Sequence, residues 1–347
     1  MENATGKTVH TRNGELDFFR FVFAVVVFCY HLGFLPYNFE SGYLGVEFFF
    51  LCSGYFLMQF IRKDRNDKNI YTRLIEYTKK RLQRLYLPYI FATASAYFIK
   101  WIILKEISLR TVVYRGIPEF FMLQGFGFTR IITTIWYVSA LMICSVGLYW
   151  LSMVLKDHFL PFLFFSSFII VSILIRKNGS LNSMNVTIID DGTWRGFAEM
   201  GFGCLLYAVK ERINTDARWT RFLWIPKILL SVIILYLLYA SDGAASSFLV
   251  LVLLFVFLLL LFTDDSRLHL FFNKKIFYYL GNISYDFYLN QVLLIYLIRL
   301  LPENLLKQYW LITLLLLLIS NVILSGCTHA LFDRAVFCLQ KNNKKSS

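Results

Sequence analysis

The chain has 347 residues, of which 58% are hydrophobic and 16% charged, and its formal net charge is +13. Soluble proteins are roughly 25% charged, and the run from Phe248 to Phe262 carries no charge at all, so the composition excludes both a disordered chain and an ordinary soluble domain. Because the apolar runs are continuous rather than alternating, they also argue against a membrane β-barrel. They predict an all-α polytopic membrane protein.

A helix that crosses a bilayer needs about 20 mainly apolar residues, and ten segments meet this requirement. They cover residues 17–35, 44–61, 85–104, 134–155, 159–175, 194–209, 222–240, 244–263, 277–300 and 309–332. Ten crossings place both termini on one side, and 23 of the 35 Lys and Arg residues lie in the loops of that side, against 7 in the opposite loops. Cytoplasmic loops are the basic ones, so both termini are predicted to be cytoplasmic.

This placement of charge explains the basic net charge without a nucleic-acid partner. The expected partner is the lipid bilayer of the cytoplasmic (inner or plasma) membrane. Residues 1–347 are expected to form a single integral-membrane domain. The six cysteines lie in or beside apolar segments and include no CxxC pair, so neither disulfides nor a bound metal are expected.

The first span carries three ionisable residues, Asp17, Arg20 and His31. Such residues inside a membrane are functional candidates, because burying a charge there is costly. Arg20 and His31 are eleven residues apart, so they share a helix face and are separated by roughly 16 Å along the axis. Arg20 is expected at the cytoplasmic boundary, where it could simply snorkel to water. His31 is expected in the outer half, either as an active group or as a neutral histidine bonded to a neighbouring helix.

The second span begins with a glycine-rich stretch that contains Glu47. The connection back from the first span is short, so the two spans are expected to form an antiparallel hairpin with Glu47 at the depth of His31. A carboxylate beside an imidazole orients it, fixes its tautomer and raises its basicity. The alternative is an interfacial carboxylate in contact with outer water.

A basic cluster enters the third span and includes Lys80, Arg81 and Arg84. Arg81 and Arg84 are three residues apart and therefore share a helix face, at the predicted level of Arg20. Guanidinium groups at this spacing are suited to bidentate phosphate binding. The bias of basic residues toward cytoplasmic loops would by itself produce a similar cluster.

The ninth span is polar for a bilayer segment and contains Ser284, Tyr285 and Gln291. We place Gln291 at about the depth of His31, which makes these residues candidates for substrate binding. Hydrogen bonding between helices is the structural alternative.

Two further pairs occur in other spans. Trp136 and Tyr137, at the outer end of the fourth span, are interpreted first as part of an aromatic belt. Arg195 and Glu199 in the sixth span are four residues apart, which favours a structural ion pair on one helix face.

Five local motifs follow one another in a fixed order. They are Leu16-Asp17…Arg20 with ten residues before His31, Gly45-Val46-Glu47-Phe48-Phe49…Ser53-Gly54, Arg81-x-x-Arg84…Pro88, Trp136-Tyr137, and Leu280-Gly281…Ser284-Tyr285…Tyr288-Leu289. Together they resemble the acyltransferase 3 family of membrane-bound O-acyltransferases. The resemblance extends over the whole chain and agrees with the ten-span layout of that family.

The resemblance implies that an acyl group, commonly acetyl from acetyl-CoA, is transferred to a hydroxyl of a cell-surface glycan or lipid-linked sugar. In this interpretation Arg81 and Arg84 bind CoA phosphates, assisted by Arg20 and the adjacent Lys80. His31 is either the general base or a transient acyl carrier.

Glu47 would orient that histidine, and Trp136, Tyr137, Ser284, Tyr285 and Gln291 would contact substrate. The sequence departs from the family where Gln291 replaces a frequent histidine and where Asp333-Arg334 replaces Glu-Pro.

Two other classes of function remain open at this point. A transporter of a polar or lipid-linked solute would line its pathway with the same polar residues, although no inverted repeat or broken helix pair is evident. A non-catalytic scaffold could retain the fold, and the missing histidine at Gln291 is consistent with it. Transport without acyl-CoA would identify the first class.

Overall fold

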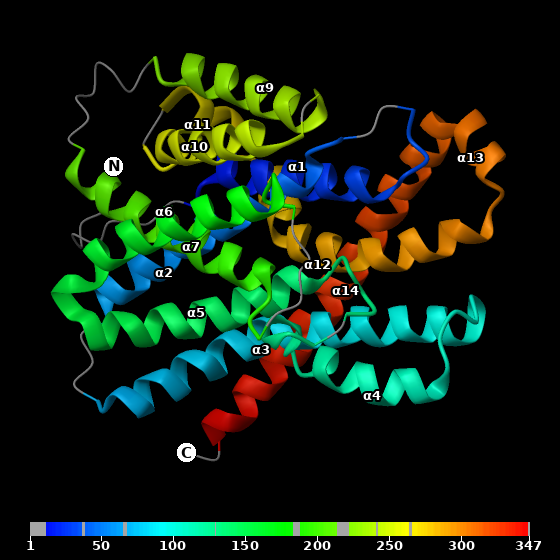
Figure 1. The fold of residues 1–347 in the computed structure, drawn as a ribbon, viewed down its shortest axis with the longest axis horizontal. Coiled ribbons are helices and arrows are strands. Elements are labelled where there is room, and N and C mark those ends of the chain that lie inside the picture. The colour runs from blue at the N-terminus through cyan, green and yellow to red at the C-terminus, as the bar shows by residue number, and fades with distance from the viewer. Residues whose placement is uncertain are drawn as a thin grey trace.

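The structure is a computed structural model that describes residues 12–36, 39–64, 68–128, 130–182, 188–213, 222–240, 242–263 and 266–345. Within these ranges the regular secondary structure is helical and contains no strand (Figure 1). The all-α prediction is therefore confirmed for the described part of the chain.

Each of the ten predicted segments coincides with a helix. These helices are α1 (Gly14–His31), α2 (Gly45–Lys63), α3 (Ile70–Phe98), α5 (Trp136–Leu155), α6 (Phe159–Asn178), α7 (Asp191–Arg212), α9 (Trp224–Ala240), α10 (Ala244–Leu261), α12 (Lys275–Leu297) and α14 (Trp310–Lys345). Shorter elements connect them: η1 (Gly42–Leu44), α4 (Leu109–Phe120), η3 (Gln124–Phe126), η4 (Lys156–His158), α11 (Ser266–Phe272), η5 (Ile298–Leu300) and α13 (Glu303–Gln308), together with a π-helical turn, η2 (Ile99–Ile103).

Two helices extend beyond the apolar segments that predicted them. α3 begins at Ile70, well before residue 85, because the side chain of Asn69 caps its first turn and no glycine or proline interrupts the basic residues that follow. α14 continues past residue 332 to Lys345. Polarity therefore marks where a predicted span ends but not where the helix ends.

Four stretches are long and apolar enough to cross a membrane: Gly42–Lys63, Trp136–Asn178, Ala244–Leu261 and Trp310–Arg334. The second of these contains both α5 and α6. The fold is that of a multi-pass membrane protein, whereas the count of ten spans and the cytoplasmic termini stay predictions. Helices such as α1 and α7 fall outside this set because they carry ionisable side chains that pair with one another inside the fold.

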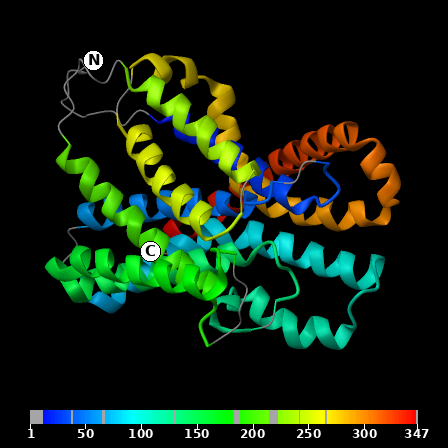
Figure 2. The ribbon, with the colours of Figure 1, turned by 45° about the horizontal axis from the view of Figure 1, so that its top comes forward.

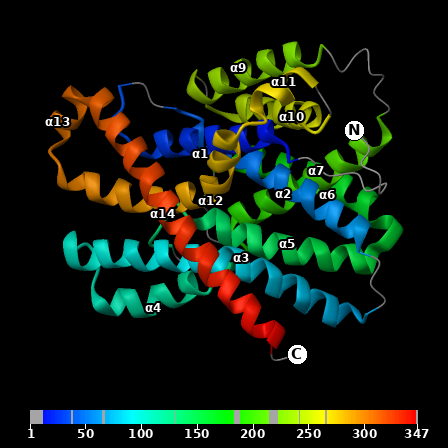
Figure 3. The same ribbon diagram turned by 180° about the vertical axis from the view of Figure 1, so that it is seen from behind.

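The interior is organised by pairs of helices that are distant in sequence. α2 packs against α7, α1 against α12, and α12 against α14. Figure 2 shows α4 beside the end of α3, and Figure 3, seen from behind, shows α14 crossing in front of α12 and α3. As a result α1, α2, α5, α7 and α12 all approach the middle of the molecule.

The crossing of α2 and α7 is close because glycine faces glycine. A Cβ at Gly203 would lie 2.2 Å from the carbonyl oxygen of Leu51, and a Cβ at Gly54 would lie 2.0 Å from that of Met200. A side chain at either position would push the helices apart, so these glycines let the two backbones touch. The contact fixes which residues of α2 face α7.

Candidate functional site

A small cavity lies at the end of α1, beside His31. Its volume is about 20 Å³, room for about one water molecule. It is lined by Val27, Tyr30, His31, Tyr43, Val46, Thr134, Trp136, Asn182, Arg195 and Tyr288. The wall of this cavity is thus formed by residues from helices α1, α2, α5, α7 and α12, among others. Most of the lining residues bear polar groups.

His31 itself has few restraints. Its ring lies edge-on to Tyr30 with the ring centroids 5.0 Å apart, and no hydrogen bond joins its imidazole to another described residue. The structural alternative for His31, a histidine hydrogen-bonded to a neighbouring helix, is therefore not what the structure contains. Its ring nitrogens are available to a ligand in the cavity.

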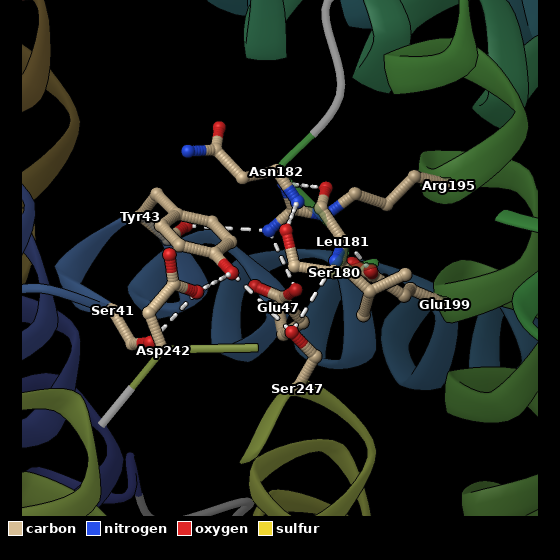
Figure 4. A network of polar contacts seen from close by, with 10 residues as sticks. All are labelled: Ser41, Tyr43, Glu47, Ser180, Leu181, Asn182, Arg195, Glu199, Asp242 and Ser247. Atoms are coloured by element: carbon tan, nitrogen blue, oxygen red, sulfur yellow. Dashed lines mark hydrogen bonds and ion pairs between the residues drawn. The ribbon is translucent and has the colours of Figure 1, made fainter. Parts of the chain in front are cut away.

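Figure 4 shows a buried charge network behind this cavity. The Arg195 guanidinium lies 2.5 Å from Glu47 Oε1 and 3.1 Å from Glu199 Oε1. It also donates hydrogen bonds to the main-chain carbonyls of Tyr43 and Leu181, at 3.3 and 3.2 Å. Both carboxylates are completely buried, so a single guanidinium from α7 joins α2, η1 and the segment that follows α6.

The expected contact between Glu47 and His31 is not made. Glu47 bonds to Arg195, and Arg195 in turn shares the cavity wall with His31. A guanidinium is the stronger partner because it is always charged and presents forked donors to a carboxylate. The predicted pair of Arg195 and Glu199 is confirmed. The sequence did not predict that Glu47 also binds Arg195, because this contact depends on how α2 crosses α7.

The two adjacent aromatic residues at the start of α5 occupy different environments. Two guanidinium groups lie close to the Trp136 ring, with Arg130 Cζ 5.5 Å and Arg195 Cζ 5.7 Å from the ring centroid. Tyr137 is 5% exposed and packs on Tyr288 with the ring centroids 5.5 Å apart. The aromatic-belt interpretation is wrong for Tyr137, which faces the interior, and Trp136 lines the cavity.

The candidate residues of α12 do not line the cavity. Ser284 donates a hydrogen bond to the Gly281 carbonyl of its own helix at 2.8 Å. Tyr285 donates to the main-chain carbonyl of Leu85 on α3 at 3.0 Å. Gln291 is fully buried, and its amide has no hydrogen-bond partner among the described residues. Ser284 thus bonds within α12, and Tyr285 joins α12 to α3. The side-chain amide of Gln291, in contrast, is not used in a hydrogen bond to any described residue.

A cluster of guanidinium groups, formed by Arg20, Arg81 and Arg84, lies apart from the cavity. Arg20 has one carboxylate contact, to Asp17 at 3.5 Å, and Arg81 donates a hydrogen bond to the Ser145 hydroxyl. Among the described residues no ion pair involves Arg81 or Arg84. Desolvation lowers the pKa of Arg84, and so do the nearby positive charges of Arg20 and Arg81. The cluster therefore has an excess of positive charge that an anion would relieve.

The cavity and the arginine cluster are linked by α1. This helix runs without interruption from Gly14 to His31, so Arg20 and His31 remain roughly 16 Å apart on one face. None of the three clustered arginines lines the cavity. Lys80 does not line the His31 cavity and instead lines a second cavity.

Sequence reasoning assigned Arg195 only to a structural ion pair, although an arginine inside a predicted span is itself a functional candidate. It also overlooked Tyr288, which lines the cavity. In comparison with known protein families, a family model described as an acyltransferase domain matches residues 13–329. Neither the curated proteins nor the solved structures give a match. The matched range includes the cavity, the charge network and the arginine cluster.

Proposed function

The chain belongs to the acyltransferase family whose model matches residues 13–329, and we propose the specific reaction that it catalyses as a membrane acyltransferase. An acyl group, acetyl in the first instance, passes from acyl-CoA to a hydroxyl of a cell-surface glycan or lipid-linked sugar. One observation carries the proposal: α1 presents His31 to a polar cavity at one end and Arg20 to a guanidinium cluster at the other.

On the donor side, Arg20, Arg81 and Arg84 bind the phosphates of CoA. Three guanidinium groups outnumber the two carboxylates near them, Asp17 and Asp333, and such a group suits a polyanion. The pantetheine arm then extends along α1, where it has roughly 16 Å to cover between Arg20 and His31. The donor enters from the cytoplasm in the predicted orientation.

On the acceptor side, His31 acts as the general base. Its imidazole takes the proton of the acceptor hydroxyl while that oxygen attacks the thioester carbonyl. The tetrahedral oxyanion lies beside the Arg195 guanidinium, which stabilises its charge. Collapse breaks the carbon–sulfur bond, and the CoA thiolate receives the proton from the imidazolium. The alternative order, in which His31 first carries the acyl group, uses the same two residues.

Glu47 has a positioning role in this scheme, because it touches Arg195 and not the reacting atoms. The cavity holds about one water in its present form, whereas sites for small ligands span roughly 300–1,000 Å³. The proposed reaction therefore requires the aromatic side chains of the wall, Trp136 and Tyr288, to move when substrates enter.

The test is incubation of membranes with radiolabelled acetyl-CoA, followed by analysis of the glycan fraction. His31→Ala should abolish labelling at an unchanged protein level. Arg84→Ala should raise KM for acetyl-CoA about tenfold, the effect of losing one charge-assisted hydrogen bond. Arg212→Ala, which removes an exposed guanidinium from the end of α7, is the matched control and should behave like the wild type.

Unchanged labelling with His31→Ala would remove the proposed base. Movement of a sugar or lipid-linked solute across the membrane without acyl-CoA would indicate a transporter instead. Absence of both labelling and transport in the wild type would favour a non-catalytic scaffold.

A further inference from the structure

A second cavity, of about 190 Å³, lies where the end of α2, the first turns of α3 and the end of α5 meet. It is lined by Phe60, Lys63, Asp64, Arg73, Glu76, Tyr77, Lys80 and Tyr149. The mechanism proposed for the His31 cavity assigns no role to these residues, although the sequence resemblance implies that Lys80 assists in CoA binding. The cavity is on the predicted cytoplasmic side, together with the arginine cluster.

One side of this cavity is aromatic. The rings of Tyr77 and Tyr149 lie 4.4 Å apart at 31°, and the Phe60 ring lies 5.3 Å from Tyr77 and 5.6 Å from Tyr149. Tyr77 and Tyr149 pack on each other and are buried, whereas the Phe60 ring is only partly buried and lines the cavity. A planar heterocyclic base can stack on such a ring with little regard for the identity of the base.

The charges of the cavity leave two lysines without a partner. Its carboxylates are already paired, Asp64 with Arg73 at 2.8 Å and Glu76 with a lysine outside the cavity at 2.5 Å. No ion pair joins Lys63 or Lys80 to any residue that the structure describes. Both ammonium groups therefore remain available for an anion beside the aromatic rings.

The cavity adjoins the arginine cluster through one residue. Tyr77 forms part of its aromatic side, and the Arg81 guanidinium carbon lies 5.8 Å from the Tyr77 ring centroid. A ligand with a base in the cavity and phosphates extending away from it would therefore meet Arg81 next.

We infer that this cavity binds the adenosine 3′-phosphate end of acyl-CoA, an inference that rests on the proposed function. The base stacks on the ring of Phe60, which Tyr77 and Tyr149 support from behind, and Lys63 and Lys80 bind the 3′-phosphate. A volume of about 190 Å³ is below the range for a whole small-molecule ligand, as expected for a subsite that holds one end of a long molecule. A lipid headgroup shares the phosphate but has no base for the rings to stack on.

The inference is tested with the purified full-length protein in lipid nanodiscs and three donors: acetyl-CoA, its 3′-dephospho form and S-acetyl-pantetheine. Lys63→Gln and Lys80→Gln should each raise KM for acetyl-CoA about tenfold and leave KM for the other two donors unchanged. Phe60→Leu should raise KM for both nucleotide donors but not for S-acetyl-pantetheine. Lys210→Gln, an equal charge change at the end of α7, should alter none of them.

The outcomes separate this inference from the proposed function. If the wild type uses acetyl-CoA and both lysine variants retain its preference over the dephospho form, the subsite is refuted and the acyltransferase stands. If the wild type uses none of the three donors, the proposed function itself fails. If the lysine variants change KM only in nanodiscs that contain anionic lipid, the cavity binds a headgroup and the inference is wrong.

Discussion

Replacement of Arg195 by methionine tests the charge network behind the His31 cavity. The substitution leaves Glu47 and Glu199 buried and without their cation, since both are completely inaccessible. Removing one partner of a buried ion pair costs about 3–5 kcal/mol, because the remaining charge is unpaired. At about 2 °C per kcal/mol for a chain of this size, Arg195→Met should lower the melting temperature by about 6–10 °C.

A compensated variant separates charge from packing. Glu47→Gln and Glu199→Gln, added to Arg195→Met, remove both carboxylate charges as well as the cation. Replacing a whole buried ionic group by neutral residues is often close to neutral in stability. The triple variant should therefore recover most of the lost melting temperature.

The protein provides its own reporter for this measurement. Cys52, Cys144 and Cys204 are buried on α2, α5 and α7, the helices around the network, so a thiol-reactive fluorophore detects their exposure on heating. An Arg195→Met variant that melts within about 2 °C of the wild type would refute the calculation, since that shift corresponds to about 1 kcal/mol. A triple variant as unstable as the single one would show that charge is not the cause.

Activity in the triple variant addresses the second role of Arg195. If its guanidinium stabilises the oxyanion beside His31, the triple variant should be inactive in the acetyl transfer assay although its melting temperature is largely restored. Wild-type activity in that variant would restrict Arg195 to a structural role.

Two further predictions concern stability alone. Burial raises the pKa of Glu119 on α4 to about 7 from 4.5; since the folded state holds this proton more tightly, the fold loses stability as pH rises through that window. Glu119→Gln should remove up to about 3 kcal/mol of this dependence, measured as melting temperature between about pH 5 and pH 8, and an unchanged profile would contradict it. Gly203→Ala should cost about 1–3 kcal/mol by separating α7 from α2, whereas Gly147→Ala, which meets no atom within 4 Å, should not; equal melting temperatures would refute the close crossing.

The sequence by itself determined the features that depend on local periodicity. Continuous apolar runs located the helices, and the spacing of Arg20 and His31 fixed their common face and separation on α1. The ion pair of Arg195 with Glu199 followed in the same way from four-residue spacing. These features depend only on the geometry of a single helix, which follows from the spacing of residues along the sequence.

Only the tertiary structure decided which helices meet. It paired Glu47 with Arg195 instead of His31, turned Tyr137 inward, and placed Lys80 at a separate cavity. Each outcome depends on contacts between helices far apart in sequence, above all the crossing of α2 and α7. Helical periodicity gives the face on which a residue lies, but the partner of that face is set by how the helices pack against one another.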